Sequence, residues 1–202
     1  MKTRKTLLLV LSLVLVAVVS VAGTLAYLKS EVKTITNTFT VGKVDIKLEE
    51  LKLNEDDPTK VTTAYTTENQ EYKVYPGQVL KSGEDLDKDG IVTILKDSEP
   101  CYVFVKVETV GPLSVVINTT NWKLVEGQEN VYVYGNGTDP SHSTVVTETD
   151  GVALERIITS VTVAETVEKP ADLEDAKIVL TAYAIQSDGL TVAEAWAAVS
   201  GN

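Results

Sequence analysis

The residue spacing most suggestive of chemistry is an acidic repeat in the first half of the chain. Asp85, Asp87 and Asp89 alternate with other residues and are followed by Gly90, which matches the first half of a calcium loop, D-x-D-x-D-G. The twelfth position of such a loop normally holds a bidentate glutamate, but here it is Lys96. A solvated acidic turn is the simpler interpretation, and weak calcium binding is the alternative.

The single histidine and the single cysteine limit the metal and redox chemistry that the chain can perform. His142 lies in a polar loop with one neighbouring carboxylate, whereas a catalytic zinc normally takes three protein ligands. Cys101 opens an alternating apolar stretch, so we expect a buried, inert thiol; a disulfide between chains is the alternative. We therefore predict no metal site beyond the weak calcium candidate.

No enzyme class is indicated by the remaining residues. The carboxylates are scattered without a locally spaced pair, and the usual nucleotide-binding, hydrolase and zinc-protease motifs are missing. The formal net charge of −11 makes nucleic acid a poor partner. We expect neither a catalytic residue nor a cofactor, and we expect Trp122, Tyr132 and Tyr134 to pack in a sheet rather than stack on carbohydrate.

The N-terminus has the pattern of an export signal. A basic start, Met1–Thr6, precedes an apolar run, and Thr24 and Ala26 supply the small residues at positions −3 and −1 of a cut before Tyr27. Residues 1–26 are therefore predicted to be a signal peptide. The alternative is a permanent anchor, because Leu7–Leu28 is 22 residues long and could span a bilayer.

The rest of the chain is predicted to fold as strands. Val and Thr, both β-branched, make up more than a quarter of the sequence. Period-2 alternation separated by turn residues predicts strands at 44–48, 91–95, 101–109, 122–125, 131–134, 157–163 and 177–185, with residues 49–70 a loop or weak hairpin. This pattern favours an all-β, jelly-roll-like antiparallel β-sandwich over residues 41–202.

One short helix is predicted at the C-terminal end. Thr191 and Glu194 have the spacing of a capping box, and Val192, Trp196 and Val199 then share one face. We expect this helix to close one end of the sandwich, with Tyr183 near Trp196.

Several short motifs resemble the TasA/camelysin family of Gram-positive bacteria. The most specific are Gly23–Leu28, "GTLAYL", and Thr36–Ile46, "TNTFTVGKVDI". Weaker matches follow at Tyr75–Gly77, Asp87–Ile94, Ser98–Val107 and from Leu180 to Trp196, so the resemblance covers most of the chain in pieces.

The resemblance implies a secreted jelly-roll subunit of surface or biofilm-matrix fibres, whose leader is removed by a SipW-type signal peptidase. It also implies head-to-tail assembly with other copies, in which the freed N-terminal segment of one copy completes a sheet of the next. The protein would then contact the membrane only through its uncleaved leader.

Residues 27–40 have the properties of a donated strand. The segment lacks Pro and Gly, and its side chains alternate, so main-chain bonds would supply affinity while alternate side chains fill pockets. The candidate contact residues are Tyr27, Val32, Ile35, Phe39 and Val41. The alternative is that residues 32–48 form the first strand of their own domain, which we prefer for Val41–Leu48.

Two other functions stay open at this stage. Some members of the family are classed as metallopeptidases, so a camelysin-like cell-surface metalloprotease is one alternative, although this chain offers few ligands. A surface-anchored β-sandwich that binds a ligand through its loops is the other, because fold alone does not decide function.

Overall fold

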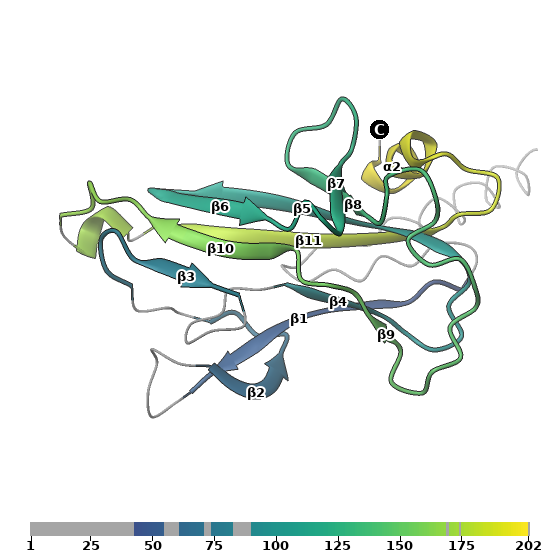
Figure 1. The fold of residues 1–202 in the computed structure, drawn as a ribbon, viewed down its shortest axis with the longest axis horizontal. Coiled ribbons are helices and arrows are strands. Elements are labelled where there is room, and N and C mark those ends of the chain that lie inside the picture. The colour runs from purple at the N-terminus through teal and green to yellow at the C-terminus, as the bar shows by residue number, and fades with distance from the viewer. Residues whose placement is uncertain are drawn as a thin grey trace, which may run out of the picture. The chain divides into compact units, whose positions relative to one another are not determined.

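A computed structural model describes residues 43–54, 61–70, 74–82, 90–168, 170–173 and 175–201. The chain divides into two compact units, Met1–Val32 and Lys33–Asn202, and every described residue belongs to the second. This unit is an all-β antiparallel sandwich with one short C-terminal helix, as the sequence predicts (Figure 1).

The described elements are eleven strands, one 3₁₀ turn and one α-helix. In chain order they are β1 (Ile46–Leu53), β2 (Val61–Thr66), β3 (Val79–Lys81), β4 (Ile91–Ile94), β5 (Cys101–Val110), β6 (Leu113–Ile117), β7 (Trp122–Leu124), β8 (Val131–Tyr134), β9 (Val152–Ala153), β10 (Ile158–Val163), η1 (Pro170–Leu173), β11 (Lys177–Gln186) and α2 (Val192–Ser200).

One layer is the sheet β11-β5-β8-β7, in which every neighbouring pair is antiparallel. Strand β5 pairs with β11 over ten residues, from Cys101 with Gln186 to Val110 with Lys177. These two strands lie far apart in sequence, which is the long-range pairing that jelly rolls require.

The other layer combines the sheets β2-β1-β4-β9 and β3-β10-β6. Residues 152–163 connect them, because β9 pairs with β4 and β10 pairs with β3 and β6. Between β9 and β10 the ladder continues, since Leu154 N donates to Val92 O at 2.8 Å and Ile157 N donates to Gly90 O at 3.3 Å.

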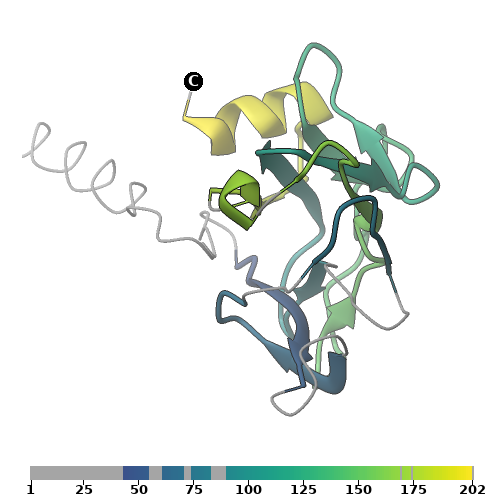
Figure 2. The ribbon, with the colours of Figure 1, turned by 90° about the vertical axis from the view of Figure 1, so that its left-hand side faces the viewer.

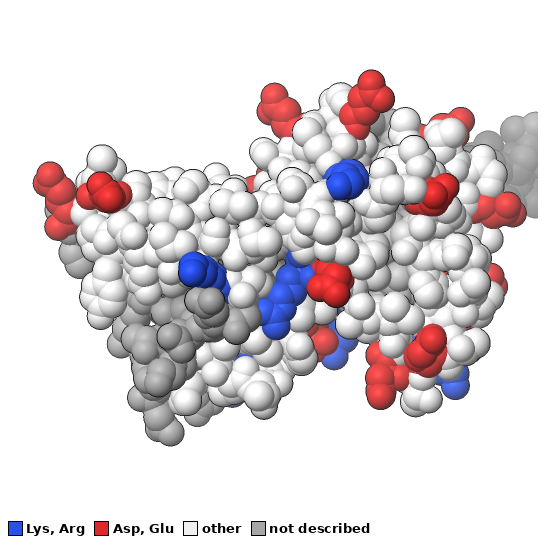
Figure 3. Space-filling model, in the orientation of Figure 1, with Lys and Arg blue, Asp and Glu red and all other residues white. Residues whose placement is uncertain are grey.

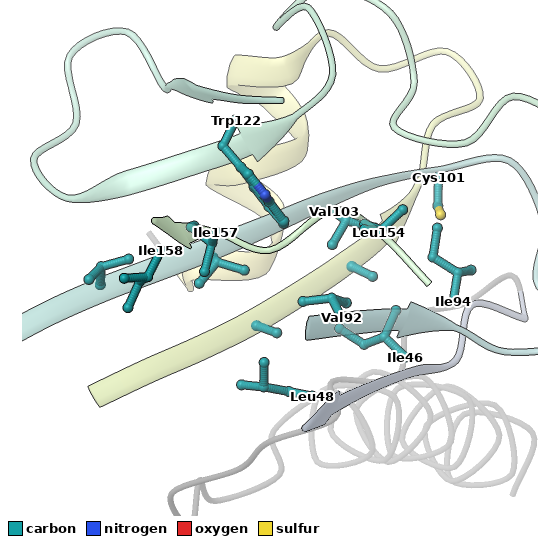
Figure 4. Packing of buried hydrophobic residues seen from close by; sticks show 14 of the residues in the cluster. Ile46, Leu48, Val92, Ile94, Cys101, Val103, Trp122, Leu154, Ile157 and Ile158 are labelled. Carbon is teal, nitrogen blue, oxygen red and sulfur yellow. The ribbon is translucent and has the colours of Figure 1, made fainter. Parts of the chain in front are cut away.

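The main hydrophobic core lies between the two layers. Its largest fully buried side chain is Trp122, and the alternate β5 residues Cys101, Val103, Val105 and Val107 contribute one wall (Figure 4). Burying these side chains at about 25 cal/mol per Å² supplies the main driving force for joining the layers.

A second cluster covers the opposite face of β5. Tyr102 and Phe104 are buried there with Trp196 of α2, and Figure 2 shows the helix lying to one side of the strands. The predicted capping box is confirmed, because Thr191 Oγ1 accepts from Glu194 N while Glu194 Oε2 accepts from Thr191 N. The expected proximity of Tyr183 and Trp196 is confirmed as well, with ring centroids 5.3 Å apart at 90°.

Some elements differ from the sequence-based expectation. The first strand extends to Leu53 and forms a hairpin with β2, so the hairpin alternative for residues 49–70 is confirmed. Strands β3, β6 and β9 were not predicted. After Gly111 and Pro112 the chain crosses to the other layer, where β6 pairs with β10 instead of β5.

Candidate functional site

Several predicted site residues lie outside the described residues. They are the cleavage residues Thr24, Ala26 and Tyr27, the donor-strand residues Val32, Ile35, Phe39 and Val41, and the calcium candidates Asp85, Asp87 and Asp89. The signal peptide, the donor strand and calcium binding therefore stay predictions.

His142 is held beside the first residue of β5 by its backbone. Cys101 N donates to His142 O at 2.9 Å, and His142 N donates to Cys101 O at 3.1 Å. The imidazole Nε2 lies 3.5 Å from Thr144 Oγ1. Within the described ranges, no group of three or more His, Cys, Asp or Glu residues is placed to hold a metal ion.

Cys101 is buried in the main core, as predicted. Its side chain has no exposed surface, and burial raises the pKa of the thiol to about 12. Since the thiolate is the reactive species, this thiol is inert at neutral pH.

The aromatic residues of the β7–β8 hairpin pack within the fold. Trp122 Nε1 donates to Glu155 O at 2.8 Å, which ties β7 to the opposite layer. The Trp122 ring also meets Tyr134 edge-on, with centroids 5.1 Å apart. Trp122 therefore packs in the sandwich, as predicted, and offers no exposed face to a carbohydrate.

The strongest candidate for an assembly site is β11, the last strand of its sheet. It lies at the end of the order β11-β5-β8-β7, and no other strand in the described part of the chain pairs with it. Its residues alternate between the two clusters: Ile178, Leu180, Ala182 and Ala184 join the main core, while Tyr183 and Ile185 join the α2 cluster. A strand edge that directs backbone groups away from its sheet is a template for strand addition.

The register shows which β11 backbone groups are directed away from β5. Ser187 N donates to Pro100 O at 2.9 Å, continuing the antiparallel pairing of Gln186 with Cys101. Alternate residues of a strand direct their N–H and C=O groups to the same side. The N–H and C=O groups of Tyr183 and Thr181 therefore point toward β5, as those of Ser187 do. The backbone groups of Ile178, Leu180 and Ala182 are therefore directed outward.

The N-terminal end of the described chain lies at the end of β11. Glu99 N donates to Lys43 O at 2.9 Å, and the next residue, Pro100, accepts from Ser187. Ser98 Oγ fixes the same corner, because it accepts from Asp45 N at 3.0 Å and donates to Asp45 O at 3.2 Å. The chain therefore enters the sandwich at the corner where β11 ends and β5 begins.

The sequence predicts the strand β11 but not its position at the edge of the described sheet. Its alternation has the same form in a central strand and in a terminal one, so the residues alone carry no signal for this role.

The fold defines a class, the antiparallel all-β sandwich, and no further assignment comes from comparison. Known protein families, curated proteins and solved structures contain no match to this chain. No helix within the described ranges is long and apolar enough to cross a membrane.

Proposed function

We propose that this chain is an exported structural subunit of extracellular or biofilm-matrix fibres. After a SipW-type signal peptidase removes residues 1–26, residues 27–40 of one copy add to the outer edge of β11 in the next. The observation that carries the proposal is that β11 is the last strand of its sheet among the described residues, while Ile178, Leu180 and Ala182 direct backbone groups outward. Such an edge binds an extended segment through main-chain hydrogen bonds.

This contact joins two different surfaces of the subunit. The donated segment precedes Lys43, whereas the acceptor edge is β11. A head-to-tail contact between unlike surfaces that does not close into a ring produces a filament. The leader acts as the switch, because the segment stays joined to the membrane-inserted leader until it is cut.

The test compares three forms of the protein by negative-stain electron microscopy: residues 27–202, the uncleaved 1–202 chain in detergent, and residues 37–202. All three contain every core residue that the structure describes, from Val44 to Val199. We expect filaments from 27–202 only. Filaments from 37–202 would contradict strand donation.

A synthetic peptide of residues 27–40 isolates the acceptor step. We expect it to bind the 37–202 chain and to shift the backbone amide resonances of Ile178, Leu180 and Ala182, while a scrambled peptide does not. Monomers from 27–202 together with no peptide binding would favour the alternative of a surface binding module. Peptide cleavage that a chelator abolishes would favour the metalloprotease alternative.

A further inference from the structure

The outer face of the β3-β10-β6 sheet forms a regular grid of six side chains. The register sets Lys81, Ser160 and Val116 in one row and Val79, Thr162 and Ser114 in the next. The intervening residues Leu80 and Val161 are buried in the core, so the six residues of the grid point outward.

The two valines of this face are apolar side chains that stay exposed to solvent. The side chains of Val79 and Val116 are 50% and 54% exposed. The outer face of the other layer differs, because α2 covers Phe104 and Tyr183 there. Its two valines and its threonine are stiff at χ1, so these three side chains lose little freedom when they become buried.

The grid contains no carboxylate, although the chain as a whole carries 29 acidic and 18 basic residues. In Figure 3, the region over the middle of β10 and β6 shows no Asp or Glu, while acidic residues lie at its left-hand end and just beyond its right-hand end. Two copies of so acidic a protein repel each other over most of their surfaces. They approach most easily through a face whose described strand residues carry no negative charge.

We propose that this grid is the lateral contact between neighbouring fibres, each grid packing on the same grid of a second copy. The inference rests on the proposed function. Stable interfaces bury about 800 Å² on each partner with roughly 20–30 residues, so six residues are too few to hold two free subunits together. A fibre repeats the grid once per subunit, and repeated weak contacts add along its length.

The charge of the chain sets the salt dependence of this contact. Repulsion between acidic fibres is screened as the Debye length falls from about 10 Å at 0.1 M salt to 3 Å at 1 M. We therefore expect bundling to increase with sodium chloride. Bundles that dissolve with salt would show an ionic contact and overturn the proposal.

The decisive experiment images filaments of the 27–202 chain and its variants by electron microscopy, with low-speed pelleting as a measure of bundling. In the double variant Val79→Glu/Val116→Glu we expect filaments that stay single, with at least about a tenfold loss of pelleted protein, equivalent to 1.4 kcal/mol. Leu124→Glu is the matched control, because Leu124 is 57% exposed on β7, outside the grid. It should bundle like the unaltered chain.

Each other outcome decides against one or both proposals. Bundles that persist in the double variant, or that are lost equally in the control, overturn the lateral contact alone. Filaments that stay single until a polysaccharide is added would place another molecule on the grid and also overturn it. The absence of filaments from every variant and from the unaltered chain overturns both the lateral contact and the fibre function.

Discussion

Lys43 O accepts a hydrogen bond from Glu99 N at 2.9 Å, one residue before Pro100 accepts from Ser187. The start of the described fold and the end of β11 are distant in sequence, but they are hydrogen-bonded to the adjacent residues Glu99 and Pro100. A segment that folded back from Lys43 along its own β11 would run parallel to that strand. A segment received from another copy is free to run antiparallel, and antiparallel pairing is slightly more stable per residue.

The acceptor edge can be blocked by proline. In Ala182→Pro the outward amide is lost while the bonds between β11 and β5 are retained, a position where proline is tolerated in an edge strand. We expect about a thirtyfold reduction in filament formation by 27–202, because a lost hydrogen bond and the added ring each cost on the order of 1 kcal/mol, or about 2 kcal/mol together. Ala182→Gly keeps the amide and is the control for the buried methyl group. If both variants assemble equally, β11 is not the acceptor.

Both faces of β5 could be predicted from the sequence, but the edge position of β11 could not. Alternation assigned Cys101 and Tyr102 to opposite faces, and both are buried in separate clusters. The start of α2 could be predicted as well, because a capping box depends only on the local spacing of Thr191 and Glu194. Strands as short as β3 and β9 show no periodicity, and the neighbours of β11 depend on long-range pairing that no local pattern encodes.

The Trp122 side chain should be a major contributor to stability. In Trp122→Phe the hydrogen bond to Glu155 O is lost and the smaller ring leaves space in the core, so we expect the free energy of unfolding to fall by about 2–4 kcal/mol. Urea denaturation followed by circular dichroism measures the change. Trp196→Phe is the matched control, since no hydrogen bond is assigned to that indole, and it should cost less. Equal losses would show that the bond between the layers contributes nothing.

The Cys101 thiol should make stability depend on alkaline pH. Burial raises its pKa from 9.0 to about 12, so the folded chain keeps the proton where the unfolded chain loses it. The stabilisation is complete below pH 9 and is lost as the pH rises toward 12, with a slope of at most about 1.4 kcal/mol per pH unit. Comparing unfolding at pH 8 and pH 10 in the unaltered chain and in Cys101→Ala isolates this group from Tyr and Lys. An equal decline in both proteins would contradict the assignment.

Gly151 is required by its surroundings. Its φ is +78°, and an added Cβ would lie 2.4 Å from Ile94 O, which belongs to the backbone of β4 and cannot swing away. Gly151→Ala should therefore lower the free energy of unfolding by about 1–3 kcal/mol. Gly127→Ala is the control: its φ is +74°, but nothing lies near an added Cβ. A larger loss in Gly127→Ala would show that the contact with β4 is not the cause.

The cap of α2 should make the helix sensitive to acid. Two hydrogen bonds from Thr191, first from its backbone amide and then from its side chain, lower the pKa of Glu194 below 4.5. The cap therefore stabilises the helix above pH 4.5 and is lost as the pH falls through the lowered value. Since Trp196 packs on Phe104, loosening of α2 should change tryptophan fluorescence before global unfolding. The change should begin at somewhat higher pH in Thr191→Ala than in the unaltered chain, because the alanine variant keeps the backbone amide but loses the hydroxyl that also lowers the Glu194 pKa. In Glu194→Gln the acid-dependent change should disappear, and if it stayed the same, another carboxylate would be responsible.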